Sequence, residues 1–192
     1  NDVTVTSLNR LPARTLDIPM ASVSDAREAY TPTHALEASP YSQSLNGTWK
    51  FQWVADPSQA STTFFEDAFD ASGWEEIDVP STWQVYGIRH GKEWDKPLYV
   101  NAAYPFTYDG KTWDVMADRP DWYSYNNKMK NPVGSYRREF TFPEEWKGRD
   151  VMLRFNGAGH GYYVWVNGEF VGYAEDSYLP SEFDITDKLR PG

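Results

Sequence analysis

Cysteine is absent from this chain of 192 residues, which excludes disulfides and thiolate metal sites. Histidine is scarce, with three residues, and His34, His90 and His160 lie in segments without a nucleophile motif. Their positions also lack the spacing of metal ligands. A Ser-His-Asp hydrolase and a zinc enzyme are therefore disfavoured.

Positive charge is in short supply, with 18 Lys and Arg against 28 Asp and Glu and a net charge of -10. Nucleic acids and anionic membranes bind basic patches, so neither is expected as a partner. Hydrophobic runs stay well below the roughly 18 residues of a membrane span. The polar residues 1–4 are not a signal peptide, and we expect a soluble, mature protein. Without cysteines, the compartment cannot be read from redox chemistry.

Aromatic residues are abundant, since 9 Trp, 13 Tyr and 10 Phe make up 17% of the chain. Such rings strengthen the cores of β-sandwiches, and they also stack on the flat faces of sugars. Both uses stay open for any single ring, with core packing the commoner one.

Alternating apolar residues between turn-forming residues predict a series of short strands. The clearest case is a hairpin, in which residues 162–166 and 170–174 flank Asn167 and Gly168, a dipeptide typical of a type I′ turn. Helices are nearly missing from the pattern, apart from a short one at 24–30 and a helix or turn at 64–70. Further strands are expected at 45–54, 76–79, 134–142 and 150–155. The pattern predicts an all-β protein, an antiparallel jelly-roll β-sandwich.

The residue pattern changes near position 45, from scattered polar residues and prolines to alternating apolar residues. Residues 1–44 contain four prolines among scattered polar residues and predict an extended N-terminal arm, whereas 45–192 predict the jelly-roll domain. Between Gly87 and Gly134 little regular structure is expected. A loop of that length in a compact domain is usually functional or an interaction surface.

Four carboxylates follow the hairpin, interspersed with hydroxyl groups: Glu175, Asp176, Glu182 and Asp184. Glycoside hydrolysis requires two carboxylates, roughly 5 to 9.5 Å apart, across the scissile bond. Glu175 and Asp176 are adjacent and would point to opposite faces of an extended strand. Glu182 and Asp184 are typical of a solvated turn or a helix cap. The cluster is therefore a better candidate for binding than for catalysis.

Several short motifs occur in a characteristic order along nearly the whole chain. They are Asn-Arg-Leu-Pro at 9–12, Leu-Asn-Gly-Thr-Trp-Lys-Phe at 45–51, Val-Pro-Ser-Thr-Trp-Gln at 79–84, Tyr-Val-Asn at 99–101 with Tyr-Pro at 104–105, Gly-Ser-Tyr-Arg-Arg at 134–138, and 166–184. The most specific is Asp-Ser-Tyr-Leu-Pro-Ser-Glu-Phe-Asp at 176–184. This series resembles the N-terminal domain of β-galactosidases of glycoside hydrolase family 2.

The resemblance implies a galactose-binding-like jelly roll at the start of an enzyme that hydrolyses terminal β-D-galactosyl residues. Immunoglobulin-like domains and a TIM barrel would follow in the same polypeptide, and the barrel would hold the catalytic glutamates. The chain is then expected to contain no catalytic residue and to be inactive alone. Because the family continues into further strands of the same domain, 45–192 is expected to be truncated at its C-terminus. An open sheet edge there favours pairing with another chain, so a homo-oligomer is expected as an option.

For the site, the resemblance implies that Asn101 and Asp176 bind the galactosyl unit. An amide offers a donor and an acceptor to a sugar hydroxyl, and a carboxylate also suits a hard cation. Asp176 is accordingly expected to ligate sodium in a site that the barrel completes, and magnesium is a second ion expected for the full enzyme. The stretch 107–130 is longer than the resemblance implies, so substrate access or subunit contacts are expected to differ there.

Two other functions stay open. An independent carbohydrate-binding module would use exposed Trp or Tyr rings to stack on sugars. A purely structural or oligomerisation domain would bury the loop that carries Asp176 away from any cleft.

Overall fold

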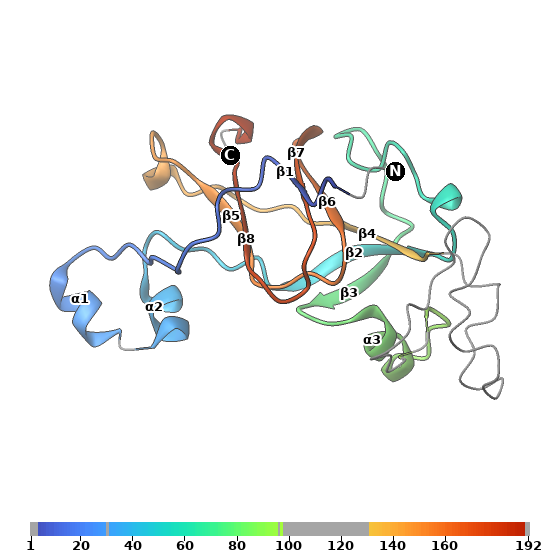
Figure 1. Ribbon diagram of the computed structural model, residues 1–192, viewed down its shortest axis with the longest axis horizontal. Helices are drawn as coiled ribbons and strands as arrows, with labels where there is room; N and C mark the ends of the chain where they lie inside the picture. Colours follow the sequence, from blue (N-terminus) through green and yellow to red (C-terminus); the bar gives the residue numbers. More distant parts are fainter. Residues whose placement is uncertain (1–3, 30, 96, 98–130, 191–192) are drawn as a thin grey trace. The chain divides into compact units, whose positions relative to one another are not determined.

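The computed structural model describes residues 4–29, 31–95, 97 and 131–190 (Figure 1). The chain divides into two compact units. The first comprises residues 1–45, 65–68 and 140–192, and the second comprises 46–64 and 69–139. Asp176, with the rest of the carboxylate cluster, lies in the first unit.

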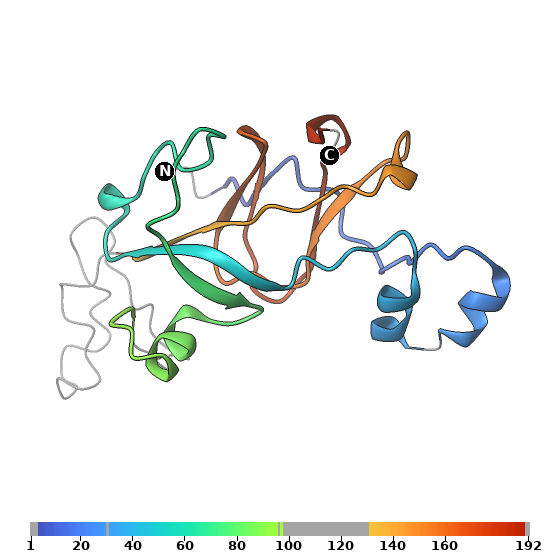
Figure 2. The same ribbon diagram turned by 180° about the vertical axis from the view of Figure 1, so that it is seen from behind.

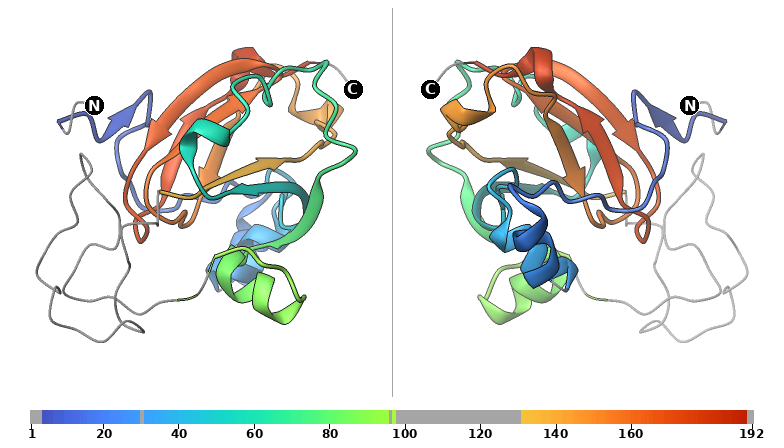
Figure 3. Two further views of the ribbon diagram at one scale, coloured as in Figure 1. Left: turned by 90° about the vertical axis from the view of Figure 1, so that its right-hand side faces the viewer. Right: turned by 90° about the vertical axis from the view of Figure 1, so that its left-hand side faces the viewer.

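The first unit contains two antiparallel sheets. One has the order β1-β7-β6, formed by Ser7–Leu8, Glu169–Ala174 and Tyr162–Val166. The other pairs β5 (Met152–Phe155) with β8 (Ser181–Asp184). Figure 3 shows the short strand β1 beside β7 at the edge of its sheet.

The turn between β6 and β7 has the predicted geometry. Asn167 and Gly168 have φ angles of 50° and 83°, the positive values that a type I′ turn requires at both central positions. The predicted hairpin is thereby confirmed. Its register shifts between Val164 and Trp165, which leaves Val171 of β7 without a partner opposite it in β6.

Alternate residues of these strands form the core of the first unit. Val164 and Val166 of β6 are buried on one face, because side chains two positions apart share a face of a strand. Val171 and Ala174 of β7 are three positions apart and are both buried in the same cluster because the register shift lies next to Val171. Phe183 of β8 is fully buried and belongs to the same cluster. The core therefore joins both sheets of the first unit.

Two short helices occupy the N-terminal part of the first unit (Figure 2). The predicted helix is present as α1 (Val23–Glu28), with Ser22 as its N-cap. The second, α2 (Pro32–Ala38), was not predicted from the sequence. Residues next to its start stabilise this helix. The Thr31 side chain accepts a hydrogen bond from the His34 N–H, and a proline occupies the first turn. Two 3₁₀ turns, Glu144–Trp146 and Thr186–Lys188, complete this unit.

The second unit is built on a sheet of order β3-β2-β4, with β2 (Gly47–Val54) between β3 (Glu75–Val79) and β4 (Val133–Arg137). Phe51 and Ile77 are fully buried on it. A 3₁₀ turn at Pro57–Gln59 follows β2, and helix α3 (Trp83–Arg89) follows β3. This helix was also missed by the sequence prediction.

The strand predicted at 134–142 is shorter than expected, since β4 ends at Arg137. Beyond that point a side chain replaces the backbone pairing. Arg138 Nη1 donates to the Thr48 carbonyl at 3.0 Å, and its guanidinium lies over the Trp49 ring. Within the described residues every sheet is antiparallel and the helices are short, which confirms the predicted all-β antiparallel class.

Candidate functional site

Asp176 lies in the loop 175–180, which joins β7 to β8. Its φ angle of 92° is unusual for a residue other than glycine and is stabilised here by a local turn. Asp176 Oδ1 accepts hydrogen bonds from the N–H groups of Tyr178, at 2.9 Å, and Leu179, at 3.2 Å. The turn fixes one carboxylate oxygen, while the side chain as a whole stays exposed.

The electrostatic surroundings keep this carboxylate ionised. The N–H groups of Tyr178 and Leu179 lower the pKa of Asp176, and the positive charge of Arg10 lowers it further. Among the described residues no hydrogen bond reaches Oδ2. One oxygen is therefore held by the protein and the other is available to a ligand.

The rest of the loop has few contacts of its own. The Tyr178 side chain is 90% exposed, and Leu179 is also exposed. Ser177 Oγ accepts a hydrogen bond of 2.9 Å from the His160 N–H, which links the loop to the turn before β6. A loop with so little apolar packing depends on polar contacts for its conformation.

Glu182 differs from its prediction as a solvated turn residue. It lies in β8, is 8% exposed, and forms ion pairs of 2.7 Å with both Arg14 and Arg154. Burial by itself raises the pKa of Glu182, but the hydrogen bonds and charges of the two arginines outweigh it, and the pKa is lowered. The prediction was wrong because both partners are distant in the sequence.

Asp184 is the exposed last residue of β8, and its side chain forms the local turn contacts that were predicted. Its Oδ1 accepts hydrogen bonds from the N–H and the hydroxyl of Thr186, and these lower the pKa of Asp184. Glu175 accepts a hydrogen bond from the Tyr173 hydroxyl. A glycosidase acid requires a raised pKa, whereas Asp176, Glu182 and Asp184 have lowered ones. The cluster therefore suits recognition better than proton transfer.

Asn101, the second predicted sugar ligand, lies outside the described residues, as does the stretch 107–130. Their roles stay predictions. Arg10, Arg14 and Arg154 are the residues near the loop that the sequence analysis did not single out. Arg10 belongs to the motif at 9–12, which was the available signal.

Comparison with known families is decisive for the class of domain. Residues 42–192 match the family described as glycosyl hydrolases family 2, sugar binding domain. The chain belongs to this family.

Relatives of this family 2 domain include β-galactosidases. The chain is 38% identical over its full length to a β-galactosidase of Priestia megaterium and covers 17% of it. It is 41% identical, over 80% of its length, to a β-galactosidase of Clostridium acetobutylicum, of which it covers 15%. The chain thus spans about a sixth of the length of the curated relatives it matches.

A solved structure supports the fold alone. The family 2 domain superposes on a β-glucuronidase from an uncultured Clostridium species with a TM-score of 0.50 and 21% identity. The match covers 78% of this chain and 20% of that one. This likeness agrees with the predicted β-sandwich.

Metal-binding capacity in the described part of the family 2 domain is limited. No group of three or more His, Cys, Asp or Glu residues there is placed to hold a metal ion. Asp176 still offers a hard oxygen ligand of the kind that sodium and similar cations accept. The same part of the chain has no helix long and apolar enough to cross a membrane.

The outer face of the β6-β7 hairpin carries a group of aromatic rings, which we call the aromatic face: Tyr163, Trp165, Phe170 and Tyr173. Tyr163 is 59% exposed, and its ring centroid lies 4.6 Å from that of Tyr173. Phe65 stacks on Trp165, with 4.9 Å between centroids and 4° between planes. Strand alternation places these rings opposite the buried valines, so some of the abundant aromatics are exposed.

Proposed function

We propose that this family 2 domain is the N-terminal domain of a β-galactosidase and helps to hold the terminal galactosyl unit. The catalytic groups would belong to downstream domains of the same polypeptide. Support comes from the relatives, which are β-galactosidases that extend far beyond the matched region. The observation that carries the residue assignment is the exposed, ionised and locally fixed carboxylate of Asp176.

Asp176 would act as a hydrogen-bond acceptor for a sugar hydroxyl. Charge-assisted hydrogen bonds are about twice as strong as neutral ones, and a preformed turn reduces the entropy lost on binding. Asn101 would complement it with a donor and an acceptor.

Sodium would share the Asp176 carboxylate. A bound sodium ion would supply a further positive charge for oxygen atoms of the substrate. A carboxylate oxygen suits a hard cation such as sodium. Asp176 alone cannot supply a full set of ligands, so the remaining oxygen donors would come from elsewhere in the polypeptide. Magnesium in the full enzyme would use residues other than those described here.

The test is Asp176→Asn in the full-length enzyme. Asparagine keeps an oxygen for the N–H groups of Tyr178 and Leu179 but removes the charge. We expect kcat/KM for nitrophenyl β-D-galactoside to fall about 10- to 100-fold, the value of a hydrogen bond to a charged group. The sodium concentration needed for half-maximal activity should rise as well.

Asp187→Asn is the matched control, because Asp187 is an exposed aspartate in the 3₁₀ turn after β8. Its kinetics should equal those of the unmodified enzyme. If Asp176→Asn also had unchanged turnover and an unchanged sodium response, the proposed role of Asp176 would be wrong.

The aromatic face favours a second candidate, an independent carbohydrate-binding module. Exposed Tyr163 and Phe170 offer apolar surfaces on which sugar rings stack. The two candidates differ in what the 192-residue chain does by itself. A module would bind lactose without any other domain, whereas a partial site would bind it very weakly.

A further inference from the structure

The two ends of the loop that carries Asp176 are both bound by one N-terminal segment, residues 6–14, which we call the strap. At the end of β7, the Glu175 N–H donates to the Thr6 carbonyl at 3.1 Å. In β8, the Glu182 carbonyl accepts from the Leu11 N–H at 2.9 Å. The strap therefore spans the loop from its first residue to the strand that follows it.

Two further contacts anchor the strap on the strands. Asn9, with a φ angle of 56°, donates from Nδ2 to the Val171 carbonyl at 2.9 Å, at the register shift of the hairpin. A residue displaced in this way lacks part of its ladder bonding, and Asn9 supplies a replacement. On the other side, Arg14 forms the ion pair with buried Glu182.

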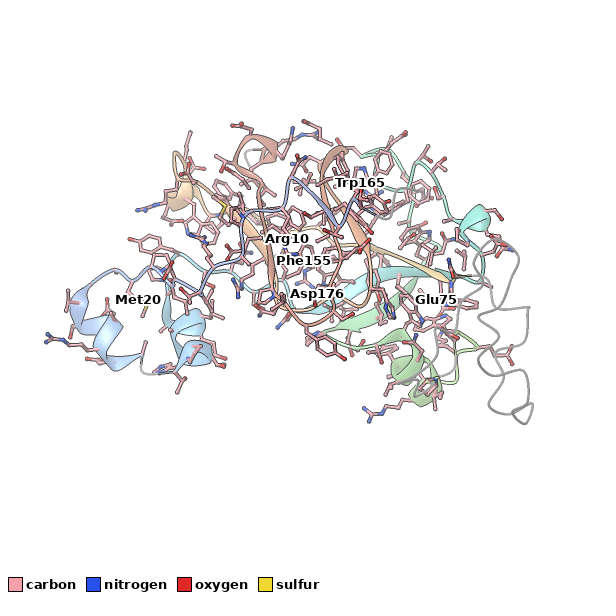
Figure 4. The ribbon with its side chains drawn as sticks, viewed as in Figure 1. Arg10, Met20, Glu75, Phe155, Trp165 and Asp176 are labelled. Atoms are coloured by element: carbon pink, nitrogen blue, oxygen red, sulfur yellow. The ribbon has the colours of Figure 1, made fainter. Side chains whose placement is uncertain are left out.

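Arg10 lies between these two anchors, beside the loop. Its Nη2 donates to the Pro180 carbonyl at 3.4 Å, at the end of the loop. Figure 4 labels both Arg10 and Asp176. A single guanidinium from the strap thus contacts the backbone at the end of the loop that contains Asp176.

We propose that Arg10, held by the strap, is a positioning residue that fixes the Asp176 turn for the galactosyl unit and its sodium ion. The inference rests on the proposed function of Asp176. Arg10 itself touches neither substrate nor ion. It acts through the loop, whose own packing is slight because Tyr178 and Leu179 are exposed.

The experiment compares Arg10→Gln with Arg10→Lys in the full-length enzyme. Residues that support a ligating group typically contribute 10- to 100-fold to metal affinity or activity. For Arg10→Gln we expect about a tenfold rise in KM and in the sodium concentration for half-maximal activation, with kcat changed less. Lysine keeps the positive charge and should restore most of the loss. Choline chloride keeps the ionic strength constant during the sodium titration.

A second readout does not depend on activity. The amides of Tyr178 and Leu179 donate to Asp176 Oδ1, so their hydrogen exchange reports the turn directly. Exchange at these two amides should be faster in Arg10→Gln than in the unmodified enzyme. Amides of β2 should be unchanged, because this strand belongs to the second unit.

Arg27→Gln is the control, since Arg27 is an exposed arginine in the last turn of α1. One outcome would overturn the role of Arg10 and leave the proposed function standing. In it, Arg10→Gln has an unchanged sodium response and unchanged amide exchange, whereas Asp176→Asn has impaired turnover. If Asp176→Asn itself were silent, the proposed function would fail, and amide exchange would still decide whether Arg10 positions the turn.

Discussion

Among single residues, Glu182 combines burial with charge, because its carboxylate is buried and forms ion pairs with two arginines. The Arg154 side chain is 19% exposed and that of Arg14 is 50% exposed, so the ion pair with Arg154 is the more buried of the two. Removing one member of a buried pair leaves the other charges without compensation, which costs more than the pair itself contributes. The stability of the strap and of β8 therefore depends on this carboxylate.

Glu182→Gln should lower the free energy of unfolding of the chain by about 3 kcal/mol at pH 7. The amide removes the charge but leaves Arg14 and Arg154 in place. Urea denaturation followed by tryptophan fluorescence measures the change. Glu169→Gln is the control, since Glu169 pairs with Lys188 at the surface with 56% of its side chain exposed, and it should cost less than about 1 kcal/mol.

The pH dependence of stability has a definite sign. Because the pKa of Glu182 is lower in the folded chain than in the unfolded one, its contribution is complete above the unfolded value of about 4.3. The contribution disappears as the pH falls through the lowered value. The difference in stability between the unmodified chain and Glu182→Gln should therefore shrink as the pH falls from 5 through the lowered pKa of Glu182. A constant difference over this range would contradict the role given to the ion pairs.

At the scale of elements, the strands with alternating apolar residues were predictable, and those held by distant side chains were not. β2, β3, β5 and the hairpin show their period in the sequence. For β8 the sequence predicts a turn, because Glu182 and Asp184 make this segment polar. Its burial becomes understandable only with Arg14, which is 168 positions from Glu182 in the sequence. The residues around Glu182 in the sequence do not reveal a partner at that distance.

Helix α3 was missed for a different reason. Its N-cap, Thr82, makes no side-chain capping hydrogen bond, and Gly87 interrupts its last turn. Thr82 is a residue type suited to an N-cap, but no capping hydrogen bond supports the helix, and glycine lowers the helix propensity. Packing of the Trp83 ring near Phe51, at 6.2 Å between centroids, is a tertiary contact that compensates.

β7 is the element through which the strap, the hairpin and β8 are joined, and Gly172 makes this possible. A Cβ at this position would lie 2.5 Å from Phe183 Cε1 and 2.6 Å from the Leu8 carbonyl oxygen. Both distances are below any normal contact. The close approach of β1 and of the core phenylalanine therefore requires glycine.

Gly172→Ala should destabilise the chain by about 2 kcal/mol, the usual cost of overpacking. Since the Leu8 oxygen belongs to backbone, the relief has to come from β1 or from the Phe183 ring. Differential scanning calorimetry measures the change as a lower Tm. Gly159→Ala should shift stability by less than about 1 kcal/mol, because a Cβ there meets no atom within 4 Å. Equal Tm values for the two variants would show that β1 does not approach β7 so closely.

For the whole molecule, the sequence predicted the family, which is confirmed. It also predicts Asp176 as a site residue, but it does not show how that residue is supported. The motif at 176–184 contains the aspartate, and its turn is local enough to be inferred from Asp-x-x spacing. Arg10 reaches the loop through the strap, which is held by the pairing of β1 with β7 and by hydrogen bonds to β8. The candidate site thus combines a linear motif with a contact between residues that are distant in the sequence.

The 192-residue chain spans only a small fraction of the length of its relatives, so its activity in isolation can be predicted. It spans 17% of the Priestia megaterium relative, and the carboxylates near Asp176 have lowered rather than raised pKa values. Hydrolysis of a β-galactoside needs a protonated acid as well as a second carboxylate. The chain should therefore release no nitrophenol from nitrophenyl β-D-galactoside, and calorimetric titration with lactose should show binding weaker than about 1 mM, since a partial site offers few contacts. Measurable turnover by the pure chain would contradict the assignment of catalysis to other domains. Tight lactose binding that Tyr163→Ala removes would instead favour the carbohydrate-binding module, with the aromatic face as its site.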